Sequence, residues 1–163
     1  GGDATNYIEG RYEAFGPGSS YLIIDTLTDN TNRALVNVRT AVTRKGGHLG
    51  SVIYNCEQAA VLAFDWKGTE EELEEALVFG DVDVRSISLE EGKAEVICAP
   101  NDLDKAKEVL GENNVTDFDM AEVTMLANDK VKLEEEDLRK FKDLLDALDD
   151  CEDVQNVYHN VEL

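Results

Sequence analysis

The sequence predicts an α/β protein of the α+β kind, with two small sandwiches of antiparallel or mixed sheet covered by helices. Three observations predict this class. Segments with the alternating pattern of strands recur along the chain among segments with the 3.6-residue period of helices. The strand and helix segments of the first third recur in the last third. With 163 residues, 42% of them hydrophobic, the chain is long enough to bury a core without disulfides.

The first third predicts a β-hairpin followed by an amphipathic helix. Residues 11–15 and 21–27 have strand-like patterns on either side of residues 16–18, where glycine and proline set the turn. Polar side chains before Thr31 offer N-caps to a helix that starts there and stops at residues 46–47, which are both glycine. The apolar side of this helix consists of Ala34, Leu35, Val38, Ala41 and Val42.

The rest of the chain continues the alternation of strands and helices. The predicted strands are residues 51–56, 60–66, 82–89, 94–99, 119–126, 131–133 and 154–159. The predicted helices are residues 69–79, 102–110 and 134–148, the last of them long and amphipathic.

Charge is distributed unevenly along this acidic chain, whose formal net charge is −21. Residues 1–58 hold six of the 36 acids and five of the 15 bases, which leaves a net charge of −20 on the other residues. Because phosphate binding needs clustered Lys and Arg, this net charge argues against the whole chain acting as a nucleic-acid binder. Only the first third remains a candidate for that role.

Cysteine use and hydropathy predict a cytoplasmic protein with no membrane partner. Cys56, Cys98 and Cys151 are widely spaced and form no CxxC pair, which argues against a disulfide framework and a zinc site. No apolar run approaches the roughly 18 residues of a membrane span. The first residues lack the pattern of a secretory signal.

Motifs of enzymes are weak in this sequence. His48 and His159 are the two histidines and lie far apart, which favours a surface turn and a strand residue over a catalytic pair. The acidic runs at residues 70–75 and 134–137 fall where helices begin, so the helix dipole explains them better than a metal does. We therefore predict no catalytic residues, no metal site and no cofactor.

Four segments carry a resemblance to a known family. They are residues 12–18 (YEAFGPG), 27–33 (LTDNTNR), 45–52 (KGGHLGSV) and 153–160 (DVQNVYHN). In order and spacing they resemble the signature segments of the YebC family of transcriptional and translational regulators. That family is related to the mitochondrial translational activator of cytochrome c oxidase. The resemblance covers essentially the whole chain.

The resemblance implies a domain organisation. YebC proteins have a basic N-terminal helical bundle and two further α/β domains, of which the third is inserted into the second. On this pattern residues 1–58 plus 128–163 form a discontinuous α/β domain, and residues 59–127 form the inserted α/β domain. We expect the chain to lack the helical bundle. The resemblance also implies a regulator of gene expression that is not an enzyme.

Basic side chains of the first predicted helix are the candidate nucleic-acid-binding residues. Arg33 and Arg44 are eleven residues apart, about 16 Å along one side of a helix. The full set of candidates is Asn30, Asn32, Arg33, Arg39, Arg44 and Lys45. Residue patterns alone favour an ordinary solvated helix face. The family resemblance favours contact with DNA or RNA.

Aromatic residues of the predicted strands are candidates for stacking on bases, although packing across a sheet is their more common role. They are Tyr12, Phe15, Tyr21, Trp66 and Tyr158. GHLG at residues 47–50 has the spacing of a KH-domain loop, but a glycine-rich link between helix and strand explains it better.

Two function classes follow from these observations. The first is a regulator of gene expression that binds DNA as a transcriptional regulator, or ribosomal RNA in the ribosome as a translation factor. The second is an acidic protein-interaction module that docks on a basic partner such as a ribosomal protein. We expect a monomer in either case.

Overall fold

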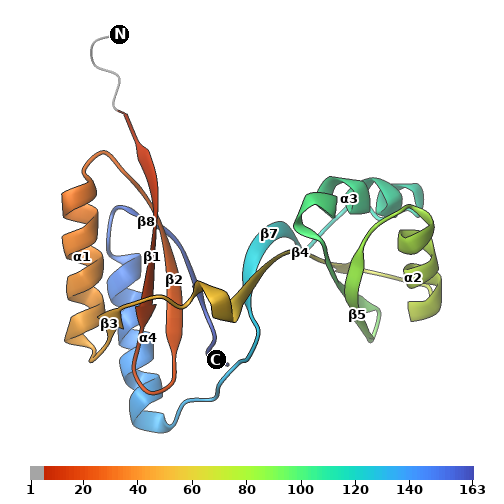
Figure 1. Cartoon of the computed structure of the whole chain (residues 1–163). Helices are drawn as coiled ribbons and strands as arrows, with labels where there is room; N and C mark the ends of the chain where they lie inside the picture. Colours follow the sequence, from red (N-terminus) through yellow and green to blue (C-terminus); the bar gives the residue numbers. More distant parts are fainter. Residues whose placement is uncertain (1–5) are drawn as a thin grey trace. The chain divides into compact units, whose positions relative to one another are not determined.

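The computed structural model describes residues 6–163, and the chain divides into two compact units. Of the described residues, the discontinuous unit contains 6–57 and 126–163, and the inserted unit contains 58–125. Each contains a four-stranded antiparallel sheet and two of the four helices (Figure 1). The α+β class predicted from the sequence is therefore confirmed.

In the discontinuous unit, α1 and α4 cover one face of a sheet with strand order β3-β1-β2-β8 (Figure 1). Its elements are β1 (Ile8–Phe15), β2 (Tyr21–Thr28), α1 (Thr31–Arg44), β3 (His48–Leu49), α4 (Glu135–Asp149) and β8 (Val154–His159). Leu22 and Ile24 of the central strand β2 point to the helices, because alternate residues of a strand share a face. They pack in one core with Phe141 and Leu144 of α4 and with Val38 of α1.

The boundaries of α1 follow from local chemistry. The side chain of Asn30 accepts a hydrogen bond from the backbone N–H of Arg33 (3.0 Å), which caps the first turn. After the last turn, Gly46 has a φ of 83°. A Cβ on Gly47 would lie 2.1 Å from the backbone oxygen of Phe15, so only glycine lets the chain pass this close to β1.

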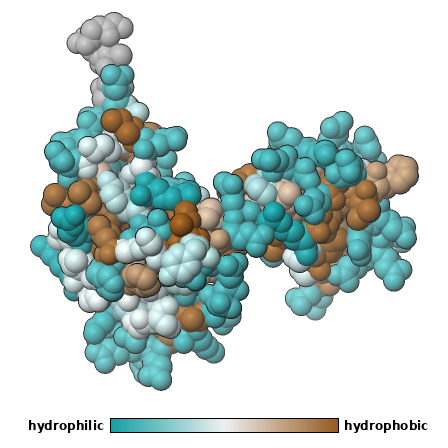
Figure 2. Space-filling model, viewed as in Figure 1, coloured by the Kyte–Doolittle hydropathy of each residue, from teal (hydrophilic) through white to brown (hydrophobic). Residues whose placement is uncertain are grey.

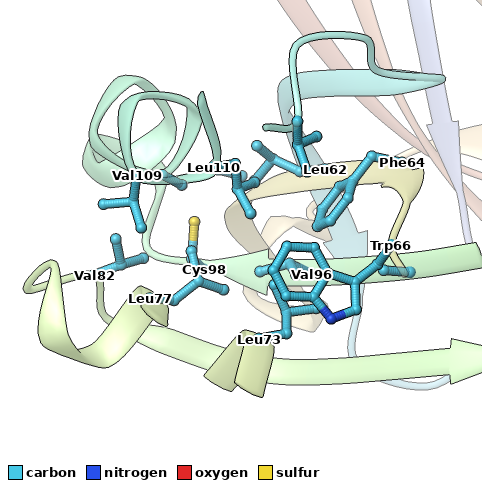
Figure 3. Close-up of a cluster of buried hydrophobic side chains, with 14 residues drawn as sticks. Leu62, Phe64, Trp66, Leu73, Leu77, Val82, Val96, Cys98, Val109 and Leu110 are labelled. Atoms are coloured by element: carbon cyan, nitrogen blue, oxygen red, sulfur yellow. The ribbon is translucent and has the colours of Figure 1, made fainter. Parts of the chain in front are cut away.

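The inserted unit has the βαββαβ order of a split β-α-β fold, with strand order β5-β6-β4-β7. Its elements are β4 (Cys56–Asp65), α2 (Glu70–Phe79), β5 (Val84–Glu90), β6 (Lys93–Cys98), α3 (Leu103–Glu112) and β7 (Met120–Ala127). Figure 3 shows its core, where Phe64 of β4 and Trp66, just after this strand, meet Leu73 of α2 and Leu110 of α3. Within residues 6–163, no helix has the length and apolarity needed to cross a membrane.

Two predicted strands are wrong. Residues 51–56 contain instead the 3-10 turn η1 (Ile53–Asn55). A carboxylate oxygen of Glu13 accepts hydrogen bonds from the N–H groups of Val52 (2.8 Å) and Ile53 (2.6 Å), so these amides are not available to a strand ladder. Residues 131–133 form only a single parallel bridge, between Val131 and Val161.

Candidate nucleic-acid interface

The helix α1 is unusual in this acidic chain because it holds three arginines and no acidic residue. Each of the other helices, α2, α3 and α4, carries acidic side chains, and α2 and α4 begin with three in the first turn. The buried side of α1 packs on the sheet, and its outer side consists mainly of Asn, Thr and Arg. Among the four helices, α1 is therefore the one best suited to face a phosphate backbone.

The candidate residues of α1 fall on two sides of the helix. Because an α-helix advances about 100° per residue, Arg33 and Arg44 lie in one row, and Asn32 and Arg39 lie in another about 120° away. The first row also contains Asn37 and Thr40, and the second contains Thr43. A single straight phosphate backbone therefore does not meet all the predicted residues at once.

The guanidinium of Arg33 is already bound to two carboxylates. It forms a bidentate salt bridge with Asp153, in which Nε donates to Oδ2 (3.0 Å) and Nη2 donates to Oδ1 (2.7 Å). Its Nη2 also donates to Oδ1 of Asp29 (2.7 Å). Asp153 is 4% exposed, and the hydrogen bond from Arg33 lowers the pKa of its carboxyl. Arg33 thus joins the start of α1 to the segment before β8, which is a structural role.

The pair between Arg33 and Asp153 makes a testable contribution to acid stability. Since the pKa of Asp153 is lower in the folded state, the stabilisation is complete at neutral pH and is lost as the pH falls below about 4. We expect Asp153→Asn to melt at a lower temperature than the wild type at pH 7, and the difference to shrink towards pH 2. Melting curves of both proteins across this range measure it. A difference that does not change with pH would contradict this assignment.

The other candidate residues differ in whether their side chains already have a hydrogen-bond or ion-pair partner in the protein. Asn30 is the N-cap of α1, so its side-chain oxygen already accepts a hydrogen bond from the backbone N–H of Arg33. Nζ of Lys45 lies 3.7 Å from Oδ2 of Asp143. Arg39 and Arg44 are exposed, and within residues 6–163 neither has an ion-pair partner. These two arginines carry the positive charge that α1 can offer to a ligand.

A groove beside α1 distinguishes the two arginines. It has a volume of about 570 Å³ and is lined by Thr40 and Arg44 of α1 and by Asp150, Cys151 and Glu152 at the end of α4. The two acids repel a phosphate that approaches Arg44 from this side. Arg39 points away from the groove, with Asn32 and Thr43 in its row, and is the better placed phosphate contact.

Tyr54 is an exposed aromatic residue that the sequence interpretation missed. Of the aromatic residues predicted to stack, Tyr21 and Trp66 are buried, and the other three are half-buried. The side chain of Tyr54 is 72% exposed. Its turn, η1, lies on the face of the sheet that carries Glu13, opposite α1. Residues 51–56 resemble a strand, and no local signal in them indicates an exposed turn.

Hydrogen bonds hold the turn of Tyr54 in place. Besides the two bonds that Glu13 accepts, the backbone oxygen of Asn55 accepts bonds from the hydroxyl of Tyr21 (3.2 Å) and from the N–H of Asn128 (2.9 Å). Tyr54 is thus presented on a fixed backbone, a geometry that suits stacking on an unpaired base.

Residues 153–160, the last of the signature segments, serve mainly to hold the fold. The side chain of Asn160, which is 2% exposed, accepts from the N–H of Tyr21 (2.8 Å) and donates to the oxygen of Ser19 (3.2 Å). The ring of His159 packs edge-on against Phe141 at 5.0 Å, and its Nδ1 accepts from the N–H of Val161. Burial lowers the pKa of His159, which keeps the ring neutral at physiological pH.

The three cysteines are free, and residues 6–163 contain no group of three or more His, Cys, Asp and Glu side chains that could hold a metal ion.

The fold and the basic outer face of α1 together define the class of protein. It is a two-unit α+β protein in which one unit interrupts the other and one acid-free basic helix belongs to an otherwise acidic chain. The chain belongs to the TACO1/YebC family, because residues 7–161 match the model of the family's second and third domains. The family predicted from the four signature segments is therefore confirmed.

Known relatives agree with this assignment. The chain is 44% identical over 165 residues to the probable transcriptional regulatory protein YeeN of Escherichia coli K12, and the match covers 99% of the chain and 68% of the relative. YeeN of Shigella flexneri matches to the same extent. The crystal structure of the conserved hypothetical protein Aq1575 from Aquifex aeolicus superposes with a TM-score of 0.77 at 29% identity, covering 98% of this chain and 67% of that one.

Proposed function

We propose that this protein is a cytoplasmic regulator of gene expression that binds nucleic acid through the outer face of α1, without catalysis. Relatives in its family are named probable transcriptional regulatory proteins, which supports a regulatory role. The observation that carries the proposal is that α1 is free of acids and exposes Arg39 and Arg44, in a chain whose net charge is −21.

Electrostatics determines how such a protein approaches a phosphate backbone. The inserted unit holds 18 acids and five bases, so it repels nucleic acid. Exposed charges are screened beyond a Debye length of about 8 Å at physiological salt. A phosphate within this distance of Arg39 is therefore attracted, while a phosphate that approaches the acidic surfaces is repelled. This favours one orientation of binding and a weak overall affinity.

In this proposal the six predicted residues have different roles. Arg39 and Arg44 contact phosphates, Lys45 adds charge at the end of α1, and Asn32 offers an exposed amide. Arg33 and Asn30 act indirectly, because the first ties α1 to Asp153 and the second caps it.

The ligand that fits best is a structured RNA, such as a ribosomal RNA fragment, with duplex DNA as the alternative. Tyr54 supplies the reason, since an exposed aromatic ring stacks on the unpaired bases of RNA loops and not on a closed duplex. Because η1 and α1 lie on opposite faces of the sheet, one RNA reaches both by passing around the β3 edge.

Removing the basic residues of α1 tests the proposal. We expect the triple variant Arg39→Ala, Arg44→Ala, Lys45→Ala to bind a structured ribosomal RNA fragment more weakly than the wild type. The slope of log K against log salt should flatten by about 0.7 to 0.9 for each phosphate that the variant no longer neutralises. Fluorescence anisotropy at several salt concentrations measures this slope for the RNA and for a DNA duplex.

A matched control variant distinguishes the effect of losing these particular basic residues from the effect of lowering the net charge of the protein. The triple variant Arg139→Ala, Lys140→Ala, Lys142→Ala removes the same charge from exposed positions of α4, and it should leave the slope unchanged. Equal effects of the two triple variants, or no effect of the α1 variant in a folded protein, would eliminate this face.

The contribution of Tyr54 is tested separately. We expect Tyr54→Ala to weaken binding to an RNA that contains an unpaired loop, by about 1 to 3 kcal/mol for one stacked base, and not to alter the salt slope. Binding of duplex DNA should not change. If Tyr54→Ala bound the looped RNA as well as the wild type does, RNA would lose its advantage over DNA as the proposed ligand.

A further inference from the structure

An apolar projection stands at the end of α2, outside the nucleic-acid face. Phe79, the last residue of α2, is 96% exposed, and its neighbour Val78 is 58% exposed. Figure 2 shows hydrophobic surface at this end of α2 among hydrophilic residues. Single exposed apolar residues are common on protein surfaces. A phenylalanine that is almost wholly in water, beside an exposed valine, is a stronger signal of a contact site.

The backbone that carries Phe79 is fixed. Gly80 lies so close to α3 that an added Cβ would be 2.3 Å from Cγ2 of Val109. The turn after the helix is closed by a hydrogen bond from the N–H of Val82 to the oxygen of Leu77 (3.0 Å). Nζ of Lys105 donates to the oxygen of Asp81 (3.1 Å), which ties the same turn to α3. Phe79 is therefore held in place before any partner arrives, which lowers the entropic cost of binding.

The charge around this projection indicates the kind of partner. The helix α2 carries five glutamates, at positions 70, 71, 72, 74 and 75, and no base. The two carboxylates that follow it, Asp81 and Asp83, are exposed as well. This surface repels nucleic acid and attracts a positively charged molecule.

We propose that the exposed end of α2 is a docking site for a basic protein, whose apolar pocket receives Phe79 while its Lys and Arg side chains face the glutamates of α2. An aromatic anchor with a polar rim is a common arrangement of a binding hot spot. Glu75, one turn before Phe79 in α2, is the glutamate nearest to it along the helix. The residues of this docking site are different from those of the proposed nucleic-acid interface. Phe79 and the glutamates of α2 are the contacts by which the inserted unit would recognise a basic partner.

The test uses the full chain and the mixed basic proteins extracted from bacterial ribosomes as the probe. The wild type is immobilised beside Phe79→Ser, Phe79→Leu and the control Val123→Ser, which removes a partly exposed apolar side chain elsewhere in the inserted unit. Poly-lysine serves as a probe of charge alone, and ribosomal RNA as a probe of nucleic acid.

We expect Phe79→Ser to retain at least one basic protein at least tenfold less tightly than the wild type, a difference of about 1.4 kcal/mol. Phe79→Leu should keep most of the binding, Val123→Ser should keep all of it, and poly-lysine should not distinguish the variants. Because Phe79 contributes almost no buried surface, the fluorescence of the buried Trp66 and the melting temperature should be the same for Phe79→Ser and the wild type.

Three results would overturn the proposal. The first is equal retention of the basic proteins by Phe79→Ser and the wild type. The second is retention by the wild type that is no stronger than its retention of poly-lysine. The third is binding of ribosomal RNA that depends on Phe79. Variants of α1 should not change the retention of the basic proteins, so this test and the test of the nucleic-acid face fail independently.

Discussion

Replacing Phe141 by alanine is expected to lower the free energy of unfolding of the discontinuous unit by about 3 to 5 kcal/mol. Phe141 has no exposed surface, packs with Leu144 and Leu148 in the core under the sheet, and supports the ring of His159. The vacated space cannot be filled by small movements, because both helices and the central strand β2 contribute to the same cluster. Urea denaturation followed by amide signals of α1 measures the loss.

The single tryptophan makes this prediction specific. Trp66 lies in the core of the inserted unit, so its fluorescence reports that unit (Figure 3). The tryptophan transition should keep its midpoint in Phe141→Ala. The reciprocal variant Leu62→Ala should move the tryptophan transition by about 2 to 5 kcal/mol and leave the signals of α1 in place. If both probes moved together in both variants, the two cores would be one cooperative unit.

Truncation after residue 130 is expected to abolish the cooperative folding of the discontinuous unit. It removes α4, which supplies Phe141, Leu144 and Leu148 to the core, and β8, which pairs with β2 from Leu22 to Thr26. It also removes Asn160, so the buried N–H of Tyr21 loses its partner. Without residues 131–163, β2 is left as an edge strand, and α1 alone remains to cover the apolar face of the sheet.

The expected result of truncation is a protein with one remaining transition. Dispersed amide signals from residues 8–49 should disappear, while the melting curve of Trp66 should persist, because the core of the inserted unit contains no residue beyond position 125. A truncated chain that kept dispersed signals and a cooperative melt in its first third would contradict this account of the core.

Local sequence patterns predict most of the fold. The hairpin of β1 and β2 follows from a glycine and proline turn, α1 follows from its cap and its glycine stop, and β8 coincides with the predicted residues 154–159. The predictions of these elements agree with the structure because each element is determined by residues that are close in sequence. The prediction of a strand at residues 51–56 fails for the opposite reason. The turn found there is held by hydrogen bonds to Glu13, which lies forty residues earlier in the sequence. The prediction of a strand at residues 131–133 fails because a single bridge with Val161, which follows β8, replaces a ladder.

The candidate site was harder to predict than the fold, and the reason is again distance in sequence. Helical spacing correctly places Arg33 and Arg44 on one side of α1. It contains no information about Asp153, the residue 120 positions later that binds the guanidinium of Arg33. The exposure of Tyr54 and Phe79 likewise depends on turns that are held by remote contacts. That Arg39 and Arg44 contact nucleic acid stays a prediction.

The most direct test of the central claim, that α1 is the nucleic-acid-binding face, is a titration of the isotope-labelled chain with a structured ribosomal RNA fragment, followed by amide NMR signals. The account predicts that the shifting signals concentrate in residues 31–45 and around Tyr54, with the largest shifts in α1 around Arg39, and that the inserted unit changes little. Shifts centred on the inserted unit, or no saturable shifts in α1 at low salt, would contradict it.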